Sequence, residues 1–424
     1  MPRYNAVFGH MLVLRQQMND LPADCTTNHF FLKTTEEFPN GLFYFDLWPF
    51  TKPLLVVNSP TAANQLAHAG LDKPEEINLA MHNLTDGPNL FIMEEQPWKV
   101  WRPLFTPGFT IVLEVNVFCD LLRGQARHGT MFQLENLTIR LTIDVIGAVS
   151  VDSRWNYQVR DHPLASALRT QIEWTEFGSE MSPWYRYHPM HPLILWYNNR
   201  RLAKLVDAEI LKRYNELRAS SAGRKGDASV KDSKHDTTSS ALIYCYHGLT
   251  VKPEAMEKLR AEDDEVFGDV ATTVATISDR PHLLNQLPYT LVVIKESLRL
   301  FPPASSMRMG KPGINIVDEE GTSFPTESCY YWKDPDSFIP ERWLVGPEDP
   351  LYPPKGAWRP FEFGPRSCLG QTLALVELKT VLWDQKHRIS GTRIAVGTRA
   401  YWVEGGGGGA YPAERYPCTV TLRE

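Results

Sequence analysis

One of the six cysteines stands in a setting that could give its sulfur a chemical role. The six are Cys25, Cys119, Cys245, Cys329, Cys368 and Cys418. No two of them have the spacing of a CxxC pair, which excludes a zinc ribbon and a thioredoxin-type site. Their wide scatter favours reduced thiols over a disulfide framework. We therefore expect one functional cysteine among inert ones.

Cys368 lies near the end of the segment FEFGPRSCLG, residues 361–370. Gly364 and Gly370 allow tight backbone turns there, and the following GQTLALVELKTVLW has the apolar spacing of a helix. A cysteine at a helix N-terminus lies at the positive end of the dipole, which favours its thiolate. Arg366 adds positive charge that could also pair with an anionic cofactor group. A lone buried cysteine is usually inert, so the prediction depends on the whole segment.

This segment fits the pattern Phe-x-x-Gly-x-Arg-x-Cys-x-Gly at every fixed position and resembles the haem-binding signature of the cytochromes P-450. The resemblance implies that Cys368 ligates the iron of haem b (iron-protoporphyrin IX), and that Phe361, Gly364, Arg366 and Gly370 form the rest of this cofactor-binding segment. It also implies monooxygenation. The thiolate pushes electron density onto iron, and electrons from NADPH arrive through a separate NADPH–cytochrome reductase.

A second pattern is the helical sequence KESLR, in which Glu296 and Arg299 are three residues apart and share a face. Alone, such a pair is usually a solvated surface ion pair. The family has a Glu-x-x-Arg helix at this place, and PERW at residues 340–343 matches a further family piece. The resemblance implies that Glu296, Arg299 and Arg342 form a buried structural triad that holds the cysteine loop.

Trp98 and Arg102 are four residues apart, so an indole N–H and a guanidinium share one helical face. Two such donors suit a carboxylate, although a core Trp beside a surface Arg is the ordinary alternative. The resemblance implies that this pair binds a haem propionate, and that Arg308 is a further propionate-binding residue.

Asp236 and Thr237 precede an apolar run, which is also the pattern of a helix cap. The resemblance implies that they are the acid and alcohol that relay protons to dioxygen. The Ala-Gly that precedes this pair in the family is replaced by Ser233-Lys234. In the family a long apolar helix leads into this site, whereas polar residues precede it here. We therefore expect that the first half of the central oxygen-binding helix and the N-terminal anchor are missing, and that haem binding or turnover is impaired.

Composition limits the class of protein. With 43% hydrophobic and 22% charged residues, the chain has the composition of an ordinary globular protein. Its net charge of −6 does not favour binding to nucleic acid. No apolar run approaches the roughly 20 residues that span a bilayer. As written the chain is expected to be soluble and cytoplasmic. The resemblance implies the endoplasmic reticulum membrane and leaves peripheral membrane association open.

The predicted fold is mainly α, a single cytochrome P-450 domain over residues 1–424 in which residues 35–404 resemble the family. A smaller β-rich region should form from residues 40–60 and 305–330. Helices are predicted at residues 196–218 with a stripe that includes Leu211, from Thr237 with a break at Lys252-Pro253, and at residues 291–300. Residues 220–236 are predicted as a polar loop and 405–409 as a flexible loop.

The predicted substrate is a small hydrophobic secondary metabolite, polyketide- or terpenoid-like. This prediction follows from the resemblance, because several segments of the sequence are similar to those of fungal members, including members of mycotoxin pathways. A basic patch with Lys99, Arg359 and Lys379 is expected to meet the reductase. Two alternatives stay open. The chain could be an impaired haem-binding remnant, or a haem-thiolate isomerase or dehydratase that needs no dioxygen.

Overall fold

The computed structural model of the chain describes residues 2, 4–5, 8–19, 31, 34–35, 37–38, 42–46, 54–68, 73, 111–151, 153–174, 189–220, 236–268, 276–277, 279–303, 316–317, 323–324, 337–353, 357–362, 367–368, 370–388, 393–394, 403–406, 409–412 and 416–419.

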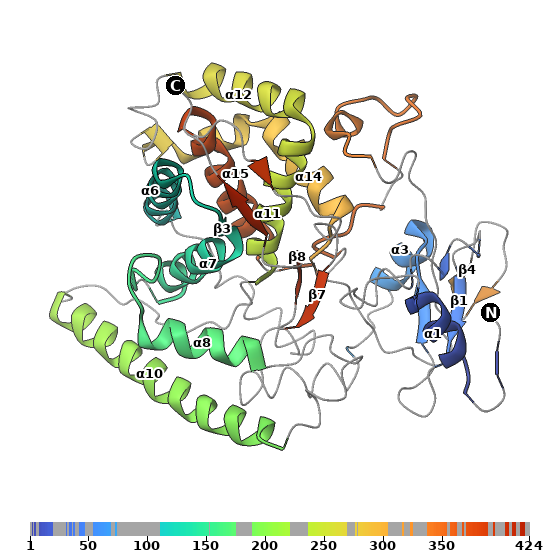
Figure 1. The fold of residues 1–424 in the computed structure, drawn as a ribbon. Coiled ribbons are helices and arrows are strands. Elements are labelled where there is room, and N and C mark those ends of the chain that lie inside the picture. The colour runs from blue at the N-terminus through green and yellow to red at the C-terminus, as the bar shows by residue number, and fades with distance from the viewer. Residues whose placement is uncertain are drawn as a thin grey trace.

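A body of helices forms most of the described structure and encloses its largest core (Figure 1). Its helices are α6 (Ile111–His128), α7 (Leu134–Val151), α11 (Asp236–Val251), α12 (Pro253–Phe267), α14 (Pro288–Leu300) and α15 (Gln371–Arg388). Every side chain from Ser239 to Leu249 on α11 is buried. A helix that is buried all round must lie inside the core. α11 packs against α7, α14, α12 and α15, and is therefore the central element.

Helices α8 (Pro163–Trp174) and α10 (His191–Ser220) form an outer layer along this body (Figure 1). α10 packs along α8, and Leu202, Leu205 and Val206 pack against a buried cluster around Trp155. The amphipathic helix predicted over residues 196–218 is therefore confirmed and is longer at both ends. Leu211 was expected in its buried stripe but is exposed. The stripe ends at Ile210, and the side chains described beyond it in α10, those of Leu211, Lys212 and Asn215, are exposed.

The predicted β-rich region is confirmed on one side of the molecule. Strands β1 (Leu42–Phe45) and β2 (Leu54–Val57) pair antiparallel, and β4 (Ile316–Val317) pairs antiparallel with β5 (Ser323–Phe324). α1 (Met11–Asn19) and α3 (Pro60–His68) lie beside them, with α3 against β4. Figure 1 shows this group apart from the helical body.

The C-terminal strands join the helical body. β9 (Pro417–Thr419) lies between β3 (Phe132–Gln133) and β6 (Arg393–Ile394). β7 (Val403–Gly406) and β8 (Gly409–Pro412) form an antiparallel pair whose β8 strand contacts α11. The expectation of a flexible loop at 405–409 was wrong for Gly405, Gly406 and Gly409, because Gly405 pairs with Ala410 and Gly406 with Gly409, while residues 407–408 lie outside the described residues. Backbone N–H and C=O groups beside the core need partners, and the pairing supplies them.

Prolines set the helix boundaries. α11 ends at Val251 and α12 begins at Pro253, as predicted, because proline is tolerated in the first helical turn. α14 begins at Pro288, earlier than predicted, after the short helix η2 (Pro281–Gln286), and it ends before Pro302. Residues 221–235 of the predicted polar loop lie outside the described residues, whereas its end residues close α10 and open α11. Among the described helices, none is long and apolar enough to cross a membrane.

Candidate active site

Cys368 is an exposed, reduced cysteine at the start of α15. Its backbone N–H donates to the carbonyl of Phe361 at 2.7 Å, and its carbonyl accepts from the N–H of Gln371 at 3.4 Å. A Cβ placed on Gly370 would lie 3.9 Å from the Cys368 sulfur, so the sulfur lies beside the residue that leads into the helix. This is the place in the chain for which the sequence predicted a thiolate, and the thiolate stays a prediction.

The chain before Cys368 is folded into a tight turn. The N–H of Glu362 donates to the carbonyl of Arg359 at 3.0 Å, and Glu362 has a φ of +60°. The half-buried ring of Phe361 packs against Trp358 at 6.0 Å and 64°. This turn points the Phe361 carbonyl at the N–H of Cys368. Gly364 and Arg366 lie outside the described residues.

The structure brings Glu296, Arg299 and Arg342 together, as the family resemblance implied. Arg299 donates to both carboxylate oxygens of Glu296, at 3.0 and 2.9 Å, and Arg342 donates to Oε1 at 3.0 Å. Glu296 and Arg342 are both 0% exposed. A buried carboxylate in this setting requires partners on both oxygens.

Two further donors, which the sequence did not reveal, complete this group. Trp343 Nε1 donates to Glu296 Oε2 at 2.9 Å, and the backbone N–H of Ile339 donates to Oε1 at 2.9 Å. Glu296, Arg299, Arg342, Trp343 and the Ile339 N–H are called the Glu296 cluster below. It joins α14 to the short helix η3 (Pro340–Trp343). Trp343 stands in the PERW motif, but no spacing rule assigns its indole to Glu296.

A series of contacts leads from the Glu296 cluster to the cysteine. Trp358 Nε1 donates to the carbonyl of Lys295, next to Glu296, at 3.0 Å, and the Trp358 ring packs edge-on against Trp343 at 6.0 Å. Trp358 also contacts Phe361, whose carbonyl holds Cys368. These contacts offer a physical path for the holding role predicted for the triad, and that role stays a prediction.

Asp236 and Thr237 are the first two residues of α11. Thr237 is half-buried, and in the same turn the Ser239 hydroxyl is 2.6 Å from the Thr138 hydroxyl of α7. This bond fixes the start of α11 on α7. The proton relay assigned to Asp236 and Thr237 stays a prediction.

Several predicted positions lie outside the described residues. They are Trp98, Lys99, Arg102 and Arg308. Of the predicted basic patch, Lys379 can be judged, and the prediction for it was wrong. It is only 8% exposed, its ammonium donates to the carbonyl of Leu284 at 2.9 Å, and burial lowers its pKa. Its long side chain extends from α15 to the Leu284 carbonyl in η2. Arg359 is half-buried and donates to Asn64 at 3.1 Å.

Glu377 on α15 is a buried acidic residue that the sequence motifs did not point to. Its side chain is buried, and burial raises its pKa to about 8, so its carboxyl group is mostly protonated near neutral pH. An acid between Val376 and Leu378 in the otherwise apolar LALVEL was the available signal.

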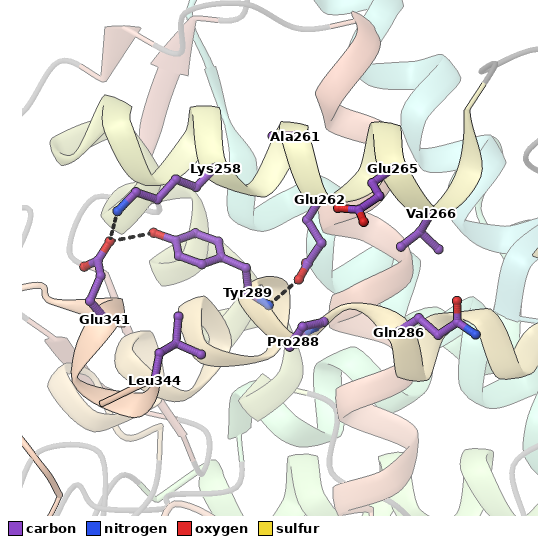
Figure 2. A pocket seen from close by; sticks show the side chains of 10 residues that line it. All are labelled: Lys258, Ala261, Glu262, Glu265, Val266, Gln286, Pro288, Tyr289, Glu341 and Leu344. Carbon is purple, nitrogen blue, oxygen red and sulfur yellow. Dashed lines mark hydrogen bonds and ion pairs between the residues drawn. The ribbon is translucent and has the colours of Figure 1, made fainter. Parts of the chain in front are cut away.

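An open pocket of about 670 Å³ lies between α12, α14 and η3 (Figure 2). Its ten lining residues are Lys258, Ala261, Glu262, Glu265, Val266, Gln286, Pro288, Tyr289, Glu341 and Leu344. Glu262 accepts from the N–H of Thr290 and from that of Tyr289, and so caps α14. Lys258 and Tyr289 both donate to Glu341. These acids bind the chain itself, and no lining residue belongs to the cysteine segment.

Comparisons with known proteins agree with this geometry. The family model "Cytochrome P-450" matches residues 235–384. Cytochrome P-450 monooxygenase polC of Polytolypa hystricis is 32% identical over 498 residues, covering 100% of this chain and 89% of the relative. Cytochrome P-450 monooxygenase acrF of Aspergillus aculeatus is 29% identical, covering 80% and 82%. The crystal structure of a mutant cytochrome P-450DA heme domain has a TM-score of 0.74 at 20% identity, covering 100% and 97%, and shares the fold.

A mainly helical fold with small sheets, a cysteine held at a helix start and a relative this similar over nearly its whole length all agree. The chain belongs to the cytochrome P-450 family of monooxygenases.

Proposed function

We propose that the chain is a haem-thiolate monooxygenase that oxidises a small hydrophobic secondary metabolite, with Cys368 as the iron ligand. The observation that carries this proposal is the position of Cys368. This residue is exposed just before α15, which begins at Gln371, and its backbone is held on both sides by hydrogen bonds.

The described residues fit a haem on the side of its thiolate ligand. The haem-thiolate bond needs a deprotonated sulfur that is accessible and fixed in direction. Cys368 is accessible, and the Phe361 carbonyl and the Gln371 N–H fix its backbone. When bound, the haem supplies the redox chemistry by which one atom of dioxygen enters the substrate.

The other proposed cofactor contacts come from the family resemblance. Trp98, Arg102 and Arg308 would pair with the propionates, and Arg366 would add a cation beside the cysteine. Asp236 and Thr237 would hold and pass the protons that the reaction consumes. The contacts from Glu296 through Trp358 to Phe361 support a rigid mounting for the sulfur.

The substrate class and the electron source are proposals of the same kind. The similarity to fungal monooxygenases such as polC and acrF supports secondary metabolism, with a polyketide- or terpenoid-like substrate and a place in a mycotoxin-type pathway. Electrons from NADPH would arrive through a separate NADPH–cytochrome reductase. We also propose that the enzyme acts at the endoplasmic reticulum membrane.

The test is the spectrum of the reduced, haem-supplied protein with carbon monoxide. Thiolate ligation gives a red-shifted Soret band, which we expect for the original chain and for the control Cys119→Ala, and which Cys368→Ser should abolish. Cys119 is buried, where a cysteine behaves as a small apolar residue. A folded original chain without the band, or a Cys368→Ser variant that keeps it, would refute the proposal.

A second candidate function is an impaired haem-binding remnant, and the length of the alignment favours it. The match to polC runs over 498 positions, more than the 424 residues of this chain, so polC has internal residues without a counterpart here. We expect one such gap before Asp236, at the polar residues 220–234. NADPH consumption without an oxidised product would identify this case. Product formation without dioxygen or reductase would instead indicate an isomerase or dehydratase.

A further inference from the structure

The first turn of α11 is joined to α7 by a hydrogen bond between two hydroxyl groups. Ser239 Oγ lies 2.6 Å from Thr138 Oγ1, and the two residues are 1% and 0% exposed. α7 and α11 pack against each other in the middle of the helical body (Figure 1). A polar contact that is fully shielded from water favours one relative position of the two helices that it joins.

The proton of the Thr138 hydroxyl is already used within α7. Thr138 Oγ1 donates to the carbonyl of Glu135 at 3.0 Å and lies 3.3 Å from that of Leu134. A hydroxyl group has one proton and two lone pairs. Ser239 is therefore the donor of the bond between the helices, and Thr138 is its acceptor. Thr138 and Ser239 are called the hydroxyl bridge below.

The first turn of α11 is the part of the helix that most needs such an anchor. α11 begins at Asp236, and the N–H groups of a first helical turn have no acceptor within the helix, so helix ends tend to open. Thr237, Thr238 and Ser239 are the described side chains of this turn, and among them Ser239 has the one hydrogen bond. The hydroxyl bridge therefore anchors this turn.

The hydroxyl bridge also sets the direction in which Thr237 points. Residues two apart in sequence lie about 200° apart around a helix, so Thr237 lies on the other side of α11 when Ser239 meets α7. About two and three turns further on, Tyr244 and Gly248 share the face of Thr237. Tyr244 stacks on the residue that follows α14, and Gly248 approaches Phe338. Thr237 therefore faces the side of α11 that leads to the Glu296 cluster.

We propose that the hydroxyl bridge positions Thr237 for the proton transfer proposed above, by holding the first turn of α11 in one orientation. The inference rests on the proposed function, because it requires Thr237 to act on protons beside the haem. Thr138 and Ser239 are positioning residues. They act through Thr237 and touch neither the haem nor the substrate.

The first experiment measures amide hydrogen exchange in the haem-supplied full chain. The amides of Ser240 and Ala241 report on the first turn, because in a helix they donate to the carbonyls of its first two residues. Thr138→Val keeps nearly the same shape but removes the acceptor of the hydroxyl bridge, so these two amides should exchange about five- to tenfold faster. Thr138→Ser keeps the hydroxyl and should restore the original rate.

Thr142→Val is the matched control on the same helix. Thr142 is 1% exposed, and its hydroxyl donates to the Ile139 carbonyl within α7 at 3.0 Å. The change removes an equally buried hydroxyl that bonds to its own helix, and should leave the exchange of the α11 amides unchanged. Thr138→Val combined with Ser239→Ala should act no more strongly than either change alone, because both remove the same bond.

The second experiment reads the Thr237 hydroxyl itself, with carbon monoxide as the probe. The infrared stretching band of carbon monoxide on the reduced haem responds to the hydroxyl dipoles beside it. Thr237→Val should shift this band, and Thr138→Val should shift it in the same direction. Thr138→Ser and Thr142→Val should keep the original band. A general loss of stability does not produce this pattern.

Two results would overturn the proposal. One is a Thr138→Val variant whose α11 amides exchange as slowly as those of Thr142→Val. The other is an infrared band that moves in Thr237→Val but stays in place in Thr138→Val. Failure of the proposed function looks different, because a folded original chain would then lack the red-shifted Soret band. The role of Thr237 would fall with it, whereas the exchange rates would still show whether the hydroxyl bridge anchors α11.

Discussion

The Glu296 cluster and the middle of α11 are both buried, but they are stabilised in different ways. In the Glu296 cluster both carboxylate oxygens accept from several donors. In α11, Tyr244 stacks on Phe301 at 4.3 Å and 5°, and among the described residues its hydroxyl has no hydrogen-bond partner. Directional bonds therefore define the first region, whereas shape and apolar packing define the second.

The two regions meet at Gly248 of α11. A Cβ at this position would lie 2.5 Å from the ring of Phe338, the residue before Ile339, whose N–H donates to Glu296. Glycine here lets α11 approach the segment that completes the Glu296 cluster. The packed region and the bonded region thus support each other at one close contact.

The largest expected effect is that of Glu296→Gln. The change removes the charge that neutralises Arg342 and Arg299, which are 0% and 5% exposed at their side chains. Breaking a buried ion pair in this way costs about 3–5 kcal/mol of the free energy of unfolding. Urea unfolding measures this cost.

The matched control for Glu296→Gln is Glu341→Gln in η3. Glu341 also pairs with basic residues, Lys252 and Lys258, but all three side chains are solvent-accessible. Exposed pairs contribute under about 1 kcal/mol. Equal losses in the two variants would show that burial does not distinguish the Glu296 cluster.

The bonded region could largely be predicted from the sequence, because its residues form short motifs. KESLR, PERW and FEFGPRSCLG point to Glu296, Arg342 and Cys368. The structure pairs Arg342 with Glu296 as the motifs implied, and the role of Cys368 as iron ligand stays a prediction. The donors Trp343 and Ile339 could not be predicted, since their contacts depend on how η3 meets α14. Helix boundaries at prolines could also be predicted, because the effect of proline on a helix depends only on its neighbours in the chain.

Tertiary packing limited the other predictions. Lys379 was expected at the surface because lysines usually lie there, but it reaches the Leu284 carbonyl from within the core. The glycines at 405–409 were expected to be flexible, but Gly405 and Gly406 pair with a neighbouring strand. The partner of Lys379 lies 95 residues away in the chain, where spacing carries no information. The partners of Gly405 and Gly406 are only a few residues away, but a run of glycines carries no strand signal.

A smaller effect, of opposite sign for two tyrosines, tests the packed region. Tyr244→Phe removes a buried hydroxyl without a partner, so the free energy of unfolding should stay equal or rise by up to about 1 kcal/mol. Tyr416→Phe removes the hydroxyl that is hydrogen-bonded to His247 Nδ1 at 3.0 Å, and should lower it by about 1–2 kcal/mol. Urea unfolding of both variants decides the matter. A destabilising Tyr244→Phe would mean that its hydroxyl is satisfied.

The smallest expected effect is one of pH, because it involves single titrating groups. Burial lowers the pKa of His247 below 6.5. The unfolded chain therefore takes up this proton before the folded one does, and stability falls as the pH drops from 6.5 toward the folded pKa. Burial tends to raise the pKa of Glu341, but hydrogen bonds from Lys258, its own N–H, Lys252 and Tyr289 outweigh it and hold the pKa at about 2. That contribution is lost only between about pH 4.5 and 2.

The contributions of His247 and Glu341 should therefore be lost in different pH ranges. Unfolding free energies measured from pH 8 to pH 3 should show a shallower slope below pH 6.5 for His247→Gln than for the original chain, while Glu341→Gln should differ in slope only below about pH 4.5. His128→Gln, at an exposed histidine of α6, is the control and should leave the slope between pH 6.5 and 5 unchanged. If His247→Gln kept the original slope, the imidazole would be protonated in the folded protein. The packing around α11 would then contain a buried charge, and the contrast with the Glu296 cluster would disappear.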